Sequence, residues 1–214
     1  MPSPFNPNVY PMHRYIVRTL SALVAMAALA GCQEIASPDD GVEESDLTFI
    51  RVGDNAPPLE ADSVVFYAVR GETRVGEMRY VTPTYTGKCL LFRVPAQSLL
   101  RHPDGRPVLQ GDSVRIVIRV EQEGRFQFRF EPSGLVFDPD FPAQLEVRYT
   151  WADLDYNDDG VVNDRDKTDA ERIAFWHQTA PGAKWKQIPT SHLINAVEAR
   201  ADVLGFSQYA LAID

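Results

Sequence analysis

The sequence feature that most constrains the fold is a pair of neighbouring segments, residues 114–120 and 125–130, in which apolar and polar side chains alternate. Because successive side chains of a β-strand point to opposite faces, this alternation gathers the apolar side chains on one face. Residues 121–124 have the composition of a hairpin loop between the two strands. The predicted sheet therefore has one dry face, formed by Val114, Ile116, Ile118, Val120, Phe126, Phe128 and Phe130.

The other, wet face of this hairpin carries mainly arginines and Gln127. An antiparallel sheet with one dry face and one wet face is typical of a β-sandwich or a β-barrel. Two roles fit the arginines. They could bind a polyanion, or, as is commoner for charged residues facing solvent, they could discourage edge-to-edge pairing of strands.

Further β-rich segments lie on both sides of this pair. Residues 63–69, 77–81 and 89–94 are rich in β-branched and aromatic side chains, and residues 191–203 alternate as a strand-turn-strand unit. No long segment with helical periodicity appears in the body of the chain. We therefore predict an all-β fold, an antiparallel β-sandwich over residues 61–214.

The N-terminus has the organisation of a secretory signal. His13, Arg14 and Arg18 form a short basic region, and an apolar run over residues 20–29 follows it. A run of about ten residues is too short to span a membrane, which takes ~20, but it has the length of a signal-peptide core. We predict a signal peptide over residues 1–31, with an uncleaved membrane anchor as the alternative.

The apolar run ends in Leu-Ala-Gly-Cys at residues 29–32, which resembles the lipobox of bacterial lipoproteins. The resemblance implies cleavage before Cys32 and lipidation of its thiol. The predicted partner is therefore a membrane, to which the lipid on Cys32 anchors the chain. Gln33 stands where an Asp would mark retention in the inner membrane, which favours the outer membrane of the cell envelope. Met12 is an alternative start, because the residues before it resemble no part of a signal peptide.

Net charge limits the partners of the mature chain. The full sequence has a net charge of −9, and removal of the signal peptide takes away Arg14 and Arg18, which leaves −11. Such a chain repels nucleic acid and anionic lipid, so neither is a predicted partner. Residues 32–60 begin with the lipidated Cys32 and are rich in Ser, Pro, Asp and Glu, which predicts a disordered tether.

An acidic stretch, residues 155–166, fits the pattern of a calcium-binding loop. Gly160 stands at the sixth position, where the chain has to turn sharply. Hard oxygen ligands select calcium or magnesium over softer metals, and calcium is the predicted cofactor. The predicted ligands are Asp155, Asn157, Asp159, the backbone carbonyl of Val161, Asn163 and Asp166.

This stretch resembles one dockerin-type calcium repeat, in which an Asp occupies the twelfth position. Dockerins use two repeats to bind cohesin and this chain has one, so the resemblance carries over the coordination chemistry and not the partner. Lys167 also stands where a helical calcium loop normally has an apolar residue. The alternative is an acidic surface turn. That alternative has to explain the mutual repulsion of five carboxylates, those of Asp155, Asp158, Asp159, Asp164 and Asp166.

Residues 125–214 contain a series of short motifs. They are Pro-Ser-Gly-Leu-Val-Phe at 132–137, a predicted strand over 142–149 that ends in Tyr, two Trp-bearing segments at 173–176 and 185–189, and Gly-Phe-Ser-Gln-Tyr-Ala-Leu at 205–211. Together they resemble the β-sandwich module named for zonula occludens proteins and netrin receptors. That family is a non-catalytic interaction or structural module, so the resemblance implies no active site. The calcium loop would be an insertion between two of its strands, where the family has a variable loop.

Catalytic motifs are few. Gly-Asp-Ser at residues 111–113 resembles the start of the GDS-type lipase and esterase block, but a predicted strand follows where the enzymes have a helix. Neither His177 nor His192 has an Asp three residues earlier, as that block requires. The sequence has no H-E-x-x-H motif, phosphate-binding glycine loop or Cys-x-x-Cys pair. Cys89 lies in an apolar strand and fits a buried small hydrophobe.

We therefore interpret the chain as a non-catalytic, membrane-anchored extracytoplasmic lipoprotein with a calcium-stabilised β-sandwich. One alternative is an envelope-assembly component whose wet sheet face docks a protein or polysaccharide partner. The other is a hydrolase, because the paired carboxylates of a glycosidase are defined by their separation in space and not by their spacing along the chain.

Overall fold

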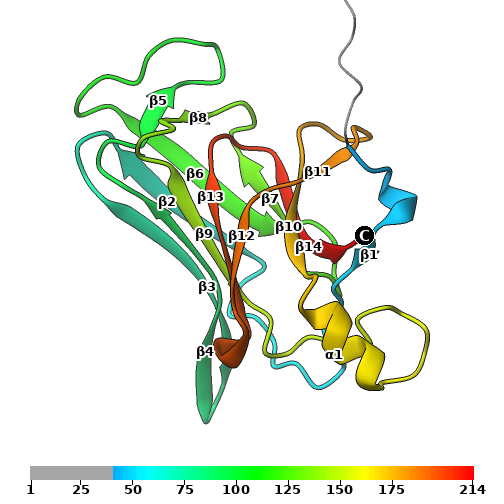
Figure 1. Ribbon diagram of the computed structural model, residues 1–214. Coiled ribbons are helices and arrows are strands. Elements are labelled where there is room, and N and C mark those ends of the chain that lie inside the picture. The colour runs from blue at the N-terminus through cyan, green and yellow to red at the C-terminus, as the bar shows by residue number, and fades with distance from the viewer. Residues whose placement is uncertain (1–40) are drawn as a thin grey trace, which may run out of the picture. The chain divides into compact units, whose positions relative to one another are not determined.

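The computed structural model describes residues 41–214, in which β-strands are the main elements of secondary structure (Figure 1). The predicted signal peptide and Cys32 lie outside the described residues. The strands are β1 Thr48–Phe49, β2 Ser63–Val69, β3 Arg74–Thr82, β4 Tyr85–Val94, β5 Leu99–Arg101, β6 Ser113–Val120, β7 Gln127–Glu131, β8 Val136–Phe137, β9 Ala143–Arg148, β10 Ala174–Gln178, β11 Trp185–Gln187, β12 Thr190–Leu193, β13 Glu198–Val203 and β14 Gln208–Ile213. The helices are the short 3-10 helices η1 Glu44–Asp46 and η2 Ile194–Ala196 and the α-helix α1 Asp164–Ala170. None of the described helices is long and apolar enough to cross a membrane.

The strands form two large antiparallel sheets. The seven-stranded sheet has the order β11, β10, β14, β7, β6, β2, and β1 also pairs with β14. The five-stranded sheet has the order β12, β13, β9, β4, β3, while β5 and β8 form a separate pair. One buried cluster contains side chains from both large sheets, so the predicted all-β antiparallel sandwich is confirmed. Strands of residues 125–214 belong to both sheets and pair with β4 and β6.

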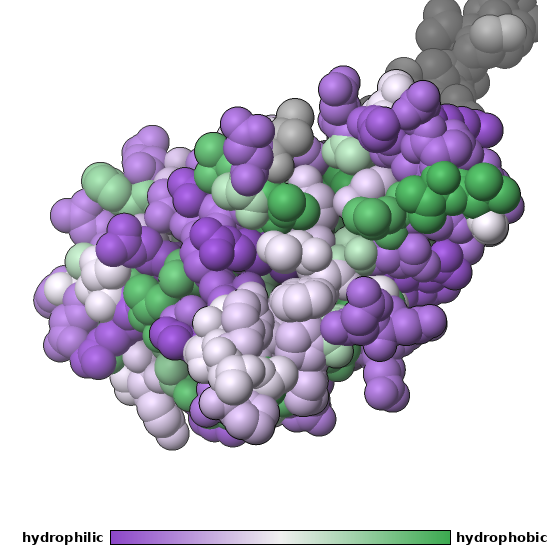
Figure 2. All heavy atoms as spheres, turned by 90° about the horizontal axis from the view of Figure 1, so that it is seen from below, coloured by the Kyte–Doolittle hydropathy of each residue, from purple (hydrophilic) through white to green (hydrophobic). Residues whose placement is uncertain are grey.

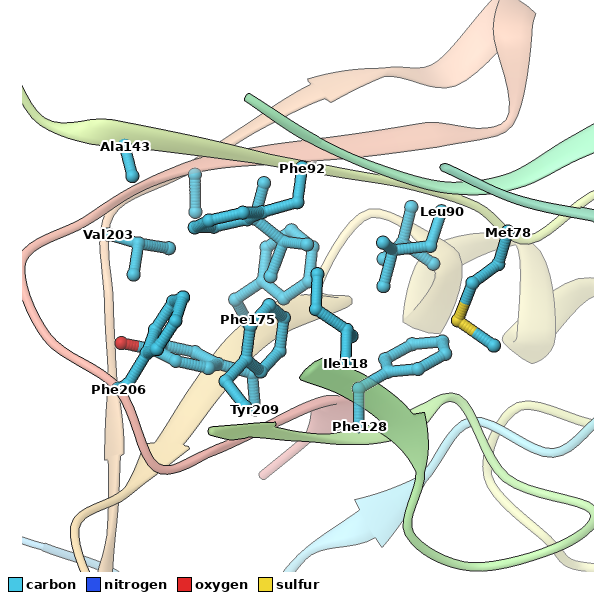
Figure 3. Close-up of a cluster of buried hydrophobic side chains, with 14 of the residues drawn as sticks. Met78, Leu90, Phe92, Ile118, Phe128, Ala143, Phe175, Val203, Phe206 and Tyr209 are labelled. Atoms are coloured by element: carbon cyan, nitrogen blue, oxygen red, sulfur yellow. The ribbon is translucent and has the colours of Figure 1, made fainter. Parts of the chain in front are cut away.

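The core between the sheets is built from aromatic and aliphatic side chains (Figure 3). Phe92 of β4 shows how closely they pack, because its ring centroid lies 5.3 Å from those of Phe130 and Phe206 and 6.1 Å from that of Phe137. Burial of one such side chain contributes about 1.5–3 kcal/mol through the hydrophobic effect. The core therefore draws its stability from side chains that are far apart in the sequence.

The alternating segments form the hairpin of β6 and β7, and their predicted dry face is in the core. All of its members are buried except Val120, which is half-buried and packs against them. The wet face differs from the prediction, because Gln127 is buried too. Gln127 lies opposite Ala210 of β14, and Ala210 belongs to an apolar cluster on the outer face of the seven-stranded sheet.

Residues 42–59, called here the N-terminal strap, contribute to that outer cluster. The strap begins with a bridge from Val42 to Trp185, continues through β1 beside β14, and ends with a bridge from Leu59 to Tyr80. The second apolar cluster consists of Leu47, Phe49, Ala174, Trp176, Trp185, Ala210 and Ala212. The strap therefore adds apolar side chains to a sheet face that the alternation predicts to be wet.

The prediction of a disordered tether over residues 32–60 is wrong for the strap, because the folded domain begins before residue 61. Leu47, Phe49 and Ile50 are buried. The backbone N–H of Ile50 donates to the carbonyl of Leu211 at 2.9 Å, so the sheet also provides a hydrogen-bond partner for the main chain of the strap. The segment is polar on average, so its composition does not reveal that these three apolar residues can attach it to the domain.

The other predicted strands are confirmed. Residues 63–69 form β2, residues 77–81 and 89–94 lie within β3 and β4, and residues 191–203 contain β12 and β13 joined by η2. The one α-helix of the described chain, α1, has no counterpart in the predicted periodicity. It has seven residues and directly follows the acidic stretch.

Candidate metal-binding loop

The predicted calcium loop, residues 155–166, lies in the connection between β9 and β10 and leads into α1 (Figure 1). A β-bridge between Ala152 and Val52 of the strap holds its entry. At its exit, Asn163 is the N-cap of α1: its side-chain oxygen accepts from the N–H of Arg165 at 2.8 Å, and Asp166 completes a capping box. The loop is therefore held on both sides by ordered backbone.

A sharp turn in the middle of the loop uses the left-handed region of backbone space. Gly160 has a φ of 86° and Asp158 a φ of 57°. A Cβ atom at Gly160 would have no neighbour within 4 Å, so the backbone conformation, and not a lack of space, favours glycine there. Asp tolerates this region better than most residues. The turn lies where the loop pattern predicts it.

Asp155, the first residue of the loop, is buried at its base. Its Oδ1 accepts from the N–H of Asp159 at 3.1 Å, and its Oδ2 accepts from the N–H of Gly160 at 2.8 Å. These bonds fold the middle of the loop back over its first residue. Because an ionised carboxylate has about four acceptor sites, two bonds leave room for a cation.

Asp166, the twelfth residue, closes the loop. Its Oδ2 accepts from the N–H of Asn163 at 2.7 Å, and its Oδ1 accepts from the N–H of Tyr156 at 2.9 Å. The side chain is buried. The N–H of Asn163 lowers the pKa of Asp166 below its ordinary value, against the opposing effect of burial, and the N–H of Tyr156 adds to the lowering. The last residue of the loop thus contacts the backbone of the second.

The remaining predicted ligands lie on the more exposed side of the loop. Oδ1 of Asn157 accepts from the N–H of Asp159 at 3.1 Å, and Oδ1 of Asp159 accepts from the N–H of Val161 at 3.0 Å. The carbonyl of Val161 accepts from Nδ2 of Asn163 at 2.9 Å. Each of these three oxygens uses one hydrogen bond and keeps a further lone pair that could ligate a cation.

The donor set fits a hard divalent cation by its chemistry, because all six predicted ligand atoms are oxygens of carboxylates, amides or a carbonyl. The acidic side chains alone do not form such a site. Over residues 41–214, no three His, Cys, Asp or Glu side chains make a group that could hold a metal ion. An ion here would depend on the amide and carbonyl oxygens as well, which suits calcium with its ~6–8 oxygen ligands.

Arg51 of the strap brings a positive charge to the loop. Its guanidinium lies 2.8 Å from Asp158, 2.9 Å from Asp153 and 3.6 Å from Asp155. The loop motif gives no signal for this residue, because Arg51 and Asp153 are 102 positions apart. Only the bridge between Val52 and Ala152, which is a feature of the fold, brings the two segments together.

Lys167 also neutralises a loop carboxylate, pairing with Asp164 at 2.7 Å. With Arg51 beside Asp155 and Asp158, two of the five loop carboxylates have no ion pair with any described residue, namely Asp159 and Asp166. Charge repulsion is therefore a weaker argument for a metal ion than the sequence alone indicates. The loop's closed geometry and its oxygen donors are the stronger arguments.

The surface around the loop is partly apolar. Leu154, Val161 and Val162 are each about 60% exposed. Figure 2 shows the end of the domain where α1 and the loop lie, with hydrophobic groups among predominantly hydrophilic ones. These side chains are apolar and take no part in the hydrogen bonding of the loop.

The residues singled out for catalysis lie apart from one another. Ser113 begins β6 and is exposed, while His177 contacts a different serine, Ser207, with Oγ and Nε2 2.8 Å apart. Burial lowers the pKa of His177. No carboxylate among residues 41–214 hydrogen-bonds to His177, so a Ser-His-acid arrangement is not assembled there. Cys89 is buried as predicted, and burial raises the pKa of its thiol to about 11.

Most of the wet-face arginines have partners. Arg119 pairs with Glu131 at 2.9 Å, Arg129 pairs with Glu121, and the guanidinium of Arg125 lies 4.9 Å from the centroid of the Phe49 ring. These contacts leave less free positive charge for a polyanion than the sequence suggests.

Comparison of the chain with protein-family models, with curated proteins and with solved structures found no match. The resemblance of residues 125–214 to the zonula occludens and netrin-receptor module stays a prediction. The same holds for the resemblance of the N-terminus to bacterial lipoproteins.

Proposed function

We propose that this chain is a non-catalytic, membrane-anchored extracytoplasmic lipoprotein whose β-sandwich is stabilised by one calcium ion. Lipid on Cys32 would hold it in the cell envelope, at the outer membrane. The six oxygen ligands between Asp155 and Asp166 would hold the ion. The domain would then serve as a binding or structural module of the envelope.

The observation that carries the calcium proposal is the closure of the loop. Asp166 reaches back to the N–H of Tyr156, so the two ends of the twelve-residue pattern lie together at its base. Asp155 meanwhile holds the turn at Gly160. An acidic surface turn would not require both end carboxylates to be buried, whereas a cation would be surrounded by them and by the exposed oxygens between them.

The ion would order a long connection and have no part in chemistry. Extracellular calcium modules bind at about 10⁻⁴–10⁻³ M. In ~1 mM calcium, mass action then adds only about 0.4–1.4 kcal/mol to the free energy of unfolding. A contribution of this size matches a structural staple on one loop of a domain whose core is already extensive.

Calorimetry of the mature chain (residues 32–214, with Cys32→Ser to keep it in solution) tests the calcium site. We expect calcium to raise the melting temperature of the parent chain relative to chelator, and Asp155→Ala to abolish that increase, because Asp155 supplies the first ligand. Asp164→Ala is the matched control: it removes a carboxylate from the same loop that is not a predicted ligand, so the calcium response should remain. An equal calcium response in Asp155→Ala would refute the site.

Metabolic labelling with an alkynyl fatty acid tests the anchor. We expect the wild-type chain and a Cys89→Ser variant to be labelled and a Cys32→Ser variant to remain unlabelled, because only Cys32 stands in the lipobox-like motif. Labelling of Cys32→Ser, or its loss in Cys89→Ser alone, would contradict the assignment.

A further inference from the structure

Arg51 lies where the strap crosses the entry to the candidate metal-binding loop. Its backbone carbonyl accepts from the N–H of Asp153 at 2.9 Å, and the next residues continue the contact through the bridge of Val52 to Ala152. The N–H of Gly53 donates to the carbonyl of Trp151 at 2.8 Å. The strap and the loop entry are thus two strands of a short antiparallel ladder, and Arg51 is the residue that extends this contact into the loop.

The side chain of Arg51 connects the strap to three carboxylates. Asp153 lies just before the loop, while Asp155 and Asp158 lie inside it. The Arg51 side chain is 39% exposed, so water screens these pairs only in part. Arg51 therefore acts as an internal cation of the loop while it helps to hold the strap in place.

The same strap also covers the second apolar cluster. Leu47 and Phe49 lie a few residues before Arg51 and pack with Trp176 and Trp185 on the outer face of the seven-stranded sheet. A change that weakens the Arg51 contacts should therefore loosen the strap near residues 50–53 first. Its effect on the cluster would be smaller, because β1 remains paired with β14.

A metal ion and Arg51 would compete for one carboxylate. Asp155 is the first predicted ligand, and it is also the buried carboxylate that the Arg51 guanidinium approaches. Two cations beside one carboxylate repel each other, and this repulsion is largest where solvent is partly excluded. Asp153 and Asp158 are not predicted ligands, so they can keep part of the contact with Arg51 when Asp155 is engaged.

We propose that Arg51 makes cation binding at the loop and docking of the strap antagonistic. This inference rests on the proposed calcium function. The Arg51 guanidinium weakens calcium binding through charge repulsion, and by thermodynamic reciprocity bound calcium weakens the attachment of the strap by the same factor. Calcium would thereby stabilise the loop and loosen the segment that precedes it, making the strap a calcium-sensitive junction between the domain and residues 32–41.

Calcium titration of the mature chain with Cys32→Ser measures one side of this coupling. We expect Arg51→Gln to bind calcium about five- to tenfold more tightly than the parent chain, at the low end of typical coupling factors because the guanidinium is partly exposed. Arg51→Lys keeps the positive charge and should bind with nearly the parent affinity. Arg119→Gln is the matched control, since it breaks a comparably exposed pair with Glu131, and among the described residues neither member pairs with a loop carboxylate, so calcium affinity should not change.

Hydrogen exchange in the parent chain and in Arg51→Gln measures the other side of this coupling. The amides of Ile50, Val52 and Gly53 donate to Leu211, Gly124 and Trp151, so their exchange reports on docking of the strap. We expect saturating calcium to speed their exchange several-fold in the parent chain and to leave it unchanged in Arg51→Gln.

The outcomes separate this inference from the proposed function. If no variant binds calcium, both are refuted. If the parent chain binds calcium but Arg51→Gln binds it equally or more weakly, the antagonism alone is refuted. Slower or unchanged exchange of the strap amides on calcium addition would likewise overturn it, because it would mean that the ion tightens the strap or leaves it unaffected.

Discussion

The outer faces of the two large sheets differ in what lies on them. The strap, whose β1 is a strand of the seven-stranded sheet, places Leu47 and Phe49 on the outer face of that sheet, where Phe49 meets Trp185 in an edge-to-face contact with centroids 5.4 Å apart. The outer face of the five-stranded sheet carries a network of ion pairs around Glu198, and within residues 41–214 no apolar cluster like that of the strap is found on it. Outward positions therefore carry aromatic residues where the strap packs on the seven-stranded sheet, and charged residues around Glu198 on the five-stranded sheet.

On the covered face, the buried polar groups of the cluster are paired only in part, because Nε1 of Trp185 has no hydrogen-bond partner among the described residues. Nε1 of Trp176 donates to the carbonyl of Ala212 at 3.2 Å, and the guanidinium of Arg125 lies over the Phe49 ring. The cluster thus behaves as a small second core, with the apolar contacts inside and a cation at its edge.

On the open face, one carboxylate collects three cations. Glu198 accepts from Arg200 at 2.7 Å and from Arg148 at 3.1 Å, and the ammonium of Lys88 lies 3.5 Å away. The side chain of Glu198 is 2% exposed, although its two arginine partners are nearly half exposed. The long side chains of Arg148 and Arg200 lie against this carboxylate and help to bury it.

The largest expected effect is on the covered face. Phe49→Ala should lower the free energy of unfolding by about 2–4 kcal/mol, because it removes a buried ring from contact with Trp185 and leaves a cavity. The strap can undock locally, which limits the loss. Urea denaturation of the mature chain measures this change. Val65→Ala, an exposed aliphatic position on the outer face of β2 in the same sheet, is the control and should cost less than about 0.5 kcal/mol.

Equal losses in Phe49→Ala and Val65→Ala would remove the distinction between the covered and the exposed parts of this sheet face. That result would mean that the strap lies on the sheet without contributing to its stability. The strap would then be a tether after all, as its composition predicts.

The strands could be predicted from the sequence because their signal is local. Residues 114–120 alternate, and each apolar side chain of that segment on the predicted dry face is at least half-buried in the structure. The strap could not be predicted in this way. Leu47, Phe49 and Ile50 stand among Ser, Asp and Glu residues. Leu47 and Phe49 are buried in a cluster with Trp176 and Trp185, more than 120 positions later, and Ile50 is buried in the core between the sheets.

The candidate site shows the same division. The turn at Gly160 and the closure by Asp166 could be predicted, because both follow from the spacing of twelve consecutive residues. The cap of α1 by Asn163 is equally local. Arg51 could not be predicted, since it reaches Asp153 only after the sheets have brought the strap and the loop together. The spacing of residues along the chain does not predict pairs between residues that only the folded structure brings together.

A smaller effect is expected on the open face. Glu198→Gln should lower the free energy of unfolding by about 1–2 kcal/mol at pH 7, between the values for exposed and for fully buried ion pairs, because water screens its half-exposed partners. Urea denaturation again gives the value. Asp202→Asn is the matched control on the same strand and face, since Asp202 is exposed and has no side-chain partner among the described residues.

The dependence of that effect on pH distinguishes the open face from the covered one. Burial alone would raise the pKa of Glu198, but hydrogen bonds from Arg200 and Arg148 and the charge of Lys88 hold it below its ordinary value of about 4.5. The folded state therefore binds this proton less tightly than the unfolded state. The stabilisation is complete above the unfolded pKa and is lost as pH falls through the folded value. The difference between the wild type and Glu198→Gln should thus shrink as pH falls from about 5 to 3, while that for Phe49→Ala stays constant, because an apolar contact has no proton to gain. If the difference in unfolding free energy between the wild type and Glu198→Gln were as large at pH 3 as at pH 7, the packing of the Glu198 side chain, and not its charge, would stabilise the open face.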